Sequence, residues 1–150
     1  MIARIKSLPR FFQVGQAIIW TAVMLPLFIS IIGLAIDGGI VYDNQHALQD
    51  VADGAARTGA TQVDQNAYRA SGGQTIVLDQ GSAQEAAVAY VSSQGTNLTA
   101  SVATDSIHVV VTVHRSVPTS FLRIVGIDTV QVSATATAEV QHGITQGSSS

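Results

Sequence analysis

The chain has 150 residues, of which only 11% are charged, and its formal net charge at pH 7 is −3. It contains no cysteine, which excludes disulfides, thiolate metal sites and thiol chemistry. The acidic balance argues against a nucleic-acid-binding protein, because phosphate contacts need a clustered basic patch.

The longest uncharged stretch covers residues 11–36. Its part from Gly15 to Ile36 would form a helix of about 33 Å, and about 20 apolar residues are enough to cross the hydrocarbon of a bilayer. We therefore predict a transmembrane helix over residues 15–36. A cleaved signal peptide is the alternative, since Gly33-Leu34-Ala35 offers the small residues of a cleavage site. We favour the span, because the apolar region of a signal peptide is usually about 7–15 residues long.

Basic residues flank the predicted span on one side only. Arg4, Lys6 and Arg10 precede it, whereas four arginines and all ten acidic residues follow it. Because basic residues beside a span stay in the cytoplasm, we expect residues 1–14 to be a cytoplasmic basic leader and the C-terminal domain to be extracytoplasmic. The protein would then be a single-pass protein of the cell membrane, in contact with membrane lipid.

Apolar and small residues continue at helical spacing beyond the span. We predict that residues 37–62 continue the helix, which gives one element from about residue 15 to 60 with a length of about 70 Å. Small residues four positions apart let another backbone approach closely. The protein's own sheet and a neighbouring copy explain this stripe about equally well. The candidate helix-packing and assembly residues are Gly33, Val41, Leu48, Ala52, Ala55, Ala56, Gly59 and Ala60.

Residues 63–141 are predicted to form the exported domain. Its first part, residues 64–82, is expected to be irregular, with turns at its glycines. Ser82 is expected to be the N-cap of a helix over residues 83–93, which Gly95 ends. Residues 142–150 are expected to be a flexible tail.

The rest of that domain alternates apolar and polar residues with period two, as a half-buried sheet does. We predict strands over residues 98–103, 106–114 and 128–140, with Thr104-Asp105 as a two-residue hairpin turn. Between the last two strands we predict a short helical turn ended by Gly126, with Phe121, Leu122 and Val125 facing inward. One apolar face per strand predicts a single, mainly antiparallel sheet covered on one side by helix, which is an α+β fold.

Side chains that carry chemistry are few. His108 and His114 point to the same face of a predicted strand but lie about 20 Å apart, so they cannot share a metal ion. The sequence has no glycine-rich phosphate loop, HExxH or GxSxG motif. We therefore expect no enzyme, and we predict no catalytic, cofactor-binding or metal-binding residue.

Two blocks of the sequence resemble the TadE/TadG-like proteins of the tight-adherence (Flp) pilus system. The first is the span ending in Ile-Asp and continuing into LQDVADGAARTGAT, where Leu48, Gln49, Ala52, Asp53, Ala55, Ala56, Gly59 and Ala60 match the family pattern. The second is VPTSFLRIVGIDTVQVSATATAEV, similar to the family's closing segment. Trp20 stands where TadE-type members and prepilins carry a glutamate, and the DxSxS metal motif of long TadG-like proteins is absent.

The resemblance implies a pilin-like fold and a non-enzymatic structural or accessory role in a pilus or secretion apparatus. It implies contacts with copies of the chain or with other subunits, in a cell-surface filament or at its base. A different hypothesis is a membrane-anchored ligand-binding or sensory ectodomain, which would need a concave polar-lined pocket.

Overall fold

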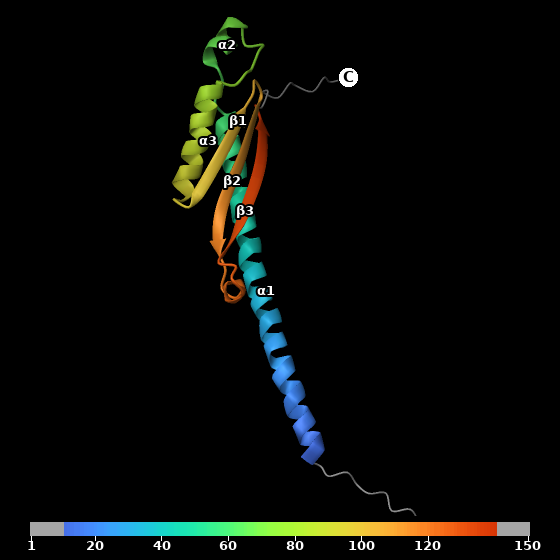
Figure 1. The fold of residues 1–150 in the computed structure, drawn as a ribbon. Helices are drawn as coiled ribbons and strands as arrows, with labels where there is room; N and C mark the ends of the chain where they lie inside the picture. The colour runs from blue at the N-terminus through green and yellow to red at the C-terminus, as the bar shows by residue number, and fades with distance from the viewer. Residues whose placement is uncertain (1–10, 141–150) are drawn as a thin grey trace, which may run out of the picture. The chain divides into compact units, whose positions relative to one another are not determined.

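The computed structural model describes residues 11–140, and side chains from residue 15 onward. Most of the predicted leader (residues 1–10) and the predicted tail (142–150) therefore lie outside the described residues. Figure 1 shows the elements in chain order, which are α1 (Phe11–Ala60), α2 (Gln65–Ala70), α3 (Gln80–Gln94), β1 (Leu98–Thr104), β2 (His108–Pro118), the 3-10 helix η1 (Leu122–Val125) and β3 (Thr129–Glu139).

The long N-terminal helix is confirmed. α1 contains 50 residues and runs without interruption through Gly38 and Gly39. The helical periodicity that continues past the apolar stretch thus reflects one continuous element.

The chain divides into two compact units. One unit joins the first part of α1, up to Gly39, with the segment Thr119–Asp128; we call its described part the apolar unit and the segment the 119–128 loop. The other contains Ile40–Pro118 and the chain from Thr129 onward, and we call it the sheet unit. The helix α1 contributes residues to both units.

The sheet unit is built on three antiparallel strands in the order β1-β2-β3. In the central strand β2, Val111 pairs with Val102 of β1 and with Ala136 of β3. Its alternate residues Val109, Val111 and Val113 are fully buried. The period-two reading of the C-terminal part, and with it the α+β fold class, is therefore confirmed.

The second part of α1 and α3 cover the apolar face of this sheet (Figure 1). Small residues let the elements come close. A Cβ added at Gly54 would lie 2.6 Å from Cζ of Tyr90 on α3. A Cβ at Gly59 would lie 3.0 Å from both the Ala83 carbonyl oxygen and a methyl group of Val109. Helix, helix and sheet thus meet at positions where α1 has little side-chain volume.

The structure corrects the expected boundaries around α3. The segment predicted to be irregular contains the helix α2, whose N-cap Asp64 accepts the backbone N–H groups of Asn66 and Ala67. The helix α3 begins before the predicted residue 83, and its N-cap is Asp79 rather than Ser82, because the Asp79 carboxylate accepts the Ser82 N–H. Gly95 ends α3 as predicted.

Two further expectations are wrong in detail. The connection between β1 and β2 has three residues instead of two. The Asp105 carboxylate accepts hydrogen bonds from the N–H groups of both Ile107 and His108, which stabilises this longer turn. The short helical turn exists as η1 and ends at Gly126, but Val125 is 73% exposed instead of facing inward.

Candidate functional site

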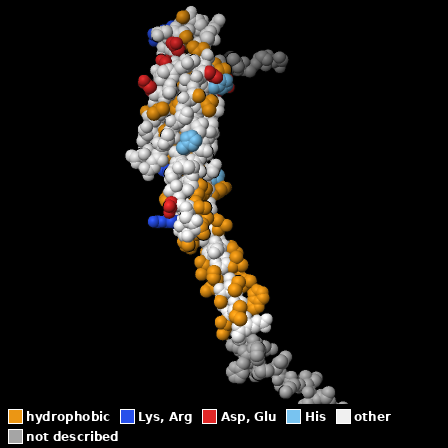
Figure 2. Space-filling view, in the orientation of Figure 1, with side chains coloured by type: hydrophobic (Ala, Val, Ile, Leu, Met, Phe, Trp, Pro, Cys, Tyr) orange, Lys and Arg blue, Asp and Glu red, His pale blue; other side chains and the backbone are white. Residues whose placement is uncertain are grey.

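The most unusual surface of the molecule is the first part of α1. Between Gly15 and Ile36, Gly33 is the one buried residue. The face drawn in Figure 2 carries hydrophobic side chains along this part of the helix. The core helix of a water-soluble protein would bury such side chains. The exposed set, each member at least 45% accessible, is Ile18, Ile19, Trp20, Val23, Leu25, Leu27, Phe28, Ile29, Ile31, Ile32, Leu34 and Ile36.

By length and composition, α1 is also the one helix among the described residues that could cross a membrane. Its exposed apolar stretch ends at Asp37, the first charged residue after the stretch begins. A hydrocarbon environment is the physical condition under which this many exposed apolar side chains would be favourable.

Asp37 closes this stretch by binding the 119–128 loop. It is 1% exposed, and its carboxylate accepts three consecutive backbone N–H groups. Ser120 N lies 2.8 Å from Oδ1, while Phe121 N and Leu122 N lie 2.9 and 2.7 Å from Oδ2. Burial acts to raise the pKa of Asp37, but the three donors outweigh it, so the pKa lies below its ordinary value. The buried carboxylate is thus held ionised by the loop backbone.

Gly33, one turn earlier on α1, forms the second contact with this loop. A Cβ at Gly33 would lie 2.5 Å from the ring of Phe121, so the ring occupies the space that a side chain would need. Gly33 and Asp37 are four residues apart and therefore share one face of the helix. Together they hold Phe121 through its side chain and its backbone.

The loop closes on itself as well. The Thr119 N–H donates to the Asp128 carbonyl at 3.0 Å, and the Thr119 hydroxyl donates to the Ile127 carbonyl. Gly126 ends η1 with φ 89°, a left-handed conformation that favours glycine. The loop is therefore a compact structure on the side of α1.

The candidate packing residues on α1 fall into two groups. Gly33 belongs to the apolar unit, in contact with Phe121. The others belong to the sheet unit, where Leu48, Ala52, Ala55, Ala56 and Gly59 are buried and Val41 and Ala60 are half-buried. Their observed neighbours are α3 and the sheet of the same chain. The structure thus brings the stripe together as part of the chain's own core.

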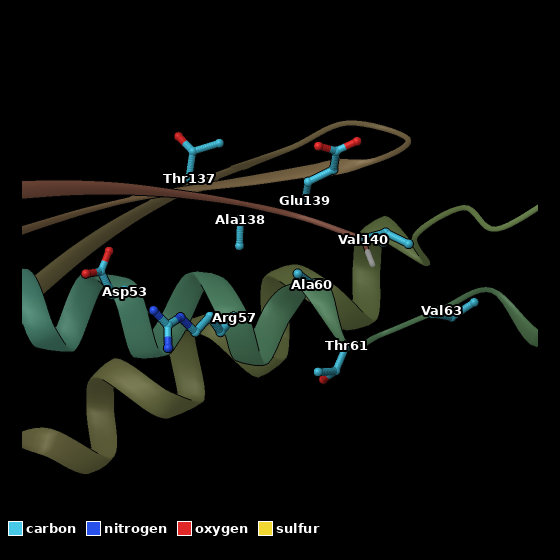
Figure 3. A pocket seen from close by; sticks show the side chains of 9 residues that line it. All are labelled: Asp53, Arg57, Ala60, Thr61, Val63, Thr137, Ala138, Glu139 and Val140. Atoms are coloured by element: carbon cyan, nitrogen blue, oxygen red, sulfur yellow. The ribbon is translucent and has the colours of Figure 1, made fainter. Parts of the chain in front are cut away.

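An open groove of about 1040 Å³ runs between α1 and β3 in the sheet unit. Its polar lining residues are Asp53, Arg57, Thr61, Thr137 and Glu139. Figure 3 shows Ala138 pointing toward α1, whereas Thr137 and Glu139 point away from it. The polar groups diverge, and Arg57 forms no ion pair within the part of the chain that is described. The groove therefore lacks the convergent polar groups of a small-molecule site.

Neither histidine of β2 takes part in a cluster of ligands. His108 contacts Asp105 at 3.1 Å on the exposed hairpin turn, and His114 lies further along the strand. Across residues 11–140, no group of three or more His, Cys, Asp or Glu side chains is arranged to hold a metal ion.

Sequence reasoning overlooked the role of Asp37, which it used only as the boundary of the apolar stretch. The signal was present, because a lone aspartate directly after an uncharged run must find partners or water. Its partners are backbone groups more than 80 residues away. Backbone donors leave no trace in the residue types, so the pairing could not be read from sequence.

These features define an α+β protein whose long apolar N-terminal helix continues into a small helix-and-sheet domain. Two family profiles match this chain: the Flp pilus-assembly TadE/G-like profile over residues 15–62, and the Tad-like Flp pilus-assembly profile over residues 43–138. The chain belongs to the Tad family of Flp pilus-assembly proteins, which confirms the resemblance seen in the sequence. No curated protein and no solved structure matched the chain.

Proposed function

We propose that this protein is a non-enzymatic, pilin-like structural or accessory subunit of a Tad/Flp-type pilus or secretion apparatus, anchored in the membrane by residues 15–36. The observation that carries the proposal is the change of environment along α1. One continuous helix exposes large apolar side chains over its first part and buries small ones over its second part. The family adds the biological setting, since its members are pilus-assembly proteins.

Retention of the helix, rather than its removal as a signal peptide, is supported by the 119–128 loop. A cut after Ala35 would separate Gly33 from Asp37, although both residues hold the same loop. It would also leave the ring of Phe121 without its neighbour. We therefore propose that residues 15–36 remain in the mature protein as a single-pass anchor.

The charge asymmetry supports an orientation with residues 1–14 in the cytoplasm and the sheet unit outside. A reporter fused after Gln13 should then be active in the cytoplasm, and one fused after Ser150 should be active outside it. Replacing Arg4, Lys6 and Arg10 together should reduce or invert this orientation. The opposite reporter pattern in the unaltered chain would overturn the proposed topology.

The proposed partners in the membrane are copies of this chain or other subunits of the apparatus. The absence of cysteine makes a direct test possible, because a single introduced cysteine is the sole crosslinking site. Cysteines placed one at a time at Ile29 and Ile32 in the exposed stretch should give crosslinked species in native membranes. A matched variant at Val88, on α3, controls for random collision. If both membrane variants stayed strictly monomeric, the subunit role would be wrong.

A further inference from the structure

We propose that the 119–128 loop is a second membrane-contacting element, which inserts Ile124 and Val125 into the bilayer leaflet where α1 ends its crossing. The partner is the lipid surface itself. This inference rests on the proposed membrane anchor, and the experiment below separates the failure of one from the failure of the other.

The first observation is exposure. Ile124 is 81% and Val125 is 73% exposed, and Ile127 beside them is 45% exposed. Among the other large apolar residues of the described chain, the highest exposed fraction is 66%, at Ile19 within the apolar stretch of α1. The loop thus presents Ile124 and Val125 more openly than any large apolar side chain of the stretch predicted to face lipid.

The second observation is position within the apolar unit. Phe121 packs on Gly33, which lies three residues before Ile36, the end of the predicted span. At about 1.5 Å per residue, this contact is about 5 Å inside the end of the span. Because Asp37 fixes Ser120, Phe121 and Leu122 by hydrogen bonds, the loop is held at this level. An apolar tip held here would lie at the boundary between headgroups and acyl chains.

The third observation is the state of the loop backbone. Irregular backbone is costly near hydrocarbon, because unpaired N–H and C=O groups find no water there. Most N–H groups of this loop are paired inside the apolar unit. The Thr119 N–H donates to the Asp128 carbonyl, and the N–H groups of Ser120, Phe121 and Leu122 donate to the Asp37 carboxylate. The N–H groups of Ile124, Gly126 and Ile127 donate to the carbonyls of Phe121, Arg123 and Leu122, respectively. The N–H groups of the loop therefore add little to the desolvation cost of approaching the acyl region.

Charge limits the depth of insertion. The Arg123 side chain lies 3.4 Å from the Asp128 carboxylate, and both side chains are about three-quarters exposed. A long arginine side chain can extend to the headgroup level while its neighbours enter the apolar region. The ion pair and the apolar tip together fit a shallow interfacial position, about 5–10 Å into the boundary.

Lipid is favoured over a second copy of the chain because this surface continues the lipid-facing surface of α1. Leu34 and Ile36, on the last turn of the stretch beside the loop, are 59% and 45% exposed. The apolar side chains of the helix end and of the loop thus belong to one unit at one level. A bilayer would cover both without a specific complementary surface.

The test uses the full chain in vesicles of phosphatidylcholine and phosphatidylglycerol, with a nitroxide attached to one introduced cysteine. The variants are Ile124→Cys and Val125→Cys, with Ile29→Cys as the control for the span and Val88→Cys as the control for water. Oxygen concentrates in the bilayer, whereas a nickel chelate stays in water. The spin relaxation that each reagent causes in the nitroxide therefore reports whether the label is surrounded by lipid or by water. All four positions are exposed, so the label needs no core space.

We expect the labels at Ile124 and Val125 to collide more with oxygen than with the nickel chelate, with a depth between that of Ile29 and the membrane surface. If Ile29 reports lipid while both loop positions match Val88, the loop proposal is overturned and the anchor stands. If Ile29 also reports water, the membrane anchor itself is wrong. If the loop labels are shielded from both reagents, a protein partner covers the loop and the lipid assignment is wrong.

Discussion

The two parts of α1 show how one helix can be hydrophobic for two different reasons. Leu34 in the apolar unit is 59% exposed, whereas Leu48 in the sheet unit is 1% exposed. The first part is rich in Ile, Leu and Phe on all sides, and the second has Ala and Gly where it meets other elements. Large side chains suit a helix surrounded by lipid, and small ones suit a helix that must approach a sheet closely.

The two units also differ in how they bury polar groups. The sheet unit closes around aliphatic side chains, whereas the apolar unit buries the carboxylate of Asp37 against backbone donors. A buried charge is tolerated when hydrogen bonds replace its water. The comparison predicts that substitutions in the sheet unit change its unfolding, and that substitutions in the apolar unit change the loop instead.

The largest difference is expected between two leucine-to-alanine substitutions, one in each part of α1. Leu48→Ala removes a fully buried side chain and should lower the free energy of unfolding of the sheet unit by about 2–5 kcal/mol. Leu34→Ala removes an exposed one and should leave that free energy unchanged. Urea unfolding of the full chain in micelles, followed by the sheet signal in circular dichroism, measures both. Equal losses would show that the two parts of the helix share one environment.

A smaller loss is expected when the helix contact is overfilled. Ala56 is 1% exposed, so Ala56→Leu has to push α1 away from its neighbours. Overpacking of this kind costs about 1–3 kcal/mol, which should lower the melting temperature of the sheet unit. Asp50→Leu, at an exposed position two residues before Ala52, is the matched control and should not lower it. Normal melting of Ala56→Leu with failed assembly would assign the stripe to a neighbouring copy.

The fold was largely predictable because its main signals are periodic. The helix spacing from Val41 to Gly59 and the alternation along β2 and β3 each repeat over many residues, so burial follows the pattern. The helix α2 was missed because it has six residues, none of them buried, and therefore no apolar period to detect. Asp79 was missed as a cap because Ser82, three residues later, satisfies the same local preference.

The candidate site was predictable only in part. The apolar stretch follows from composition and the small-residue stripe from spacing. The structure buries most of the stripe in the chain's own core, and a role of the stripe in assembly stays a prediction. The apolar residues Phe121, Leu122 and Val125 predict a core-facing turn for the 119–128 loop. Apolar residues at a turn look the same in a sequence whether they are buried or exposed. The structure separates them, because Phe121 packs on Gly33 whereas Val125 is 73% exposed.

In the apolar unit, Asp37→Asn should release the loop without unfolding the sheet. Asparagine has a single acceptor oxygen. Its NH2 group would face backbone N–H groups that donate to the second carboxylate oxygen of Asp37 in the original chain, and two donors cannot pair. We expect faster amide hydrogen exchange at Ser120, Phe121 and Leu122, and unchanged exchange in β2. Asp43→Asn, an exposed position on the same helix, is the control. Unchanged exchange in the loop would mean that Gly33 and Thr119 suffice to hold it.

The smallest effect concerns the cap of α3 and appears only as a dependence on pH. The Ser82 N–H and hydroxyl both donate to Asp79 and hold its pKa below the ordinary value of 3.8. A carboxylate with a lowered pKa stabilises the fold fully above its unfolded pKa, and this contribution is lost as the pH falls through the lower folded value. Asp79→Asn keeps a capping oxygen but cannot ionise. The gap in melting temperature between the original chain and Asp79→Asn should therefore be constant from pH 7 to about pH 5 and shrink at pH values below 3.8. Melting curves of the sheet unit recorded at pH 7, 5 and 3 measure this gap, and a gap that widened on acidification would show that the charge of Asp79 opposes the fold.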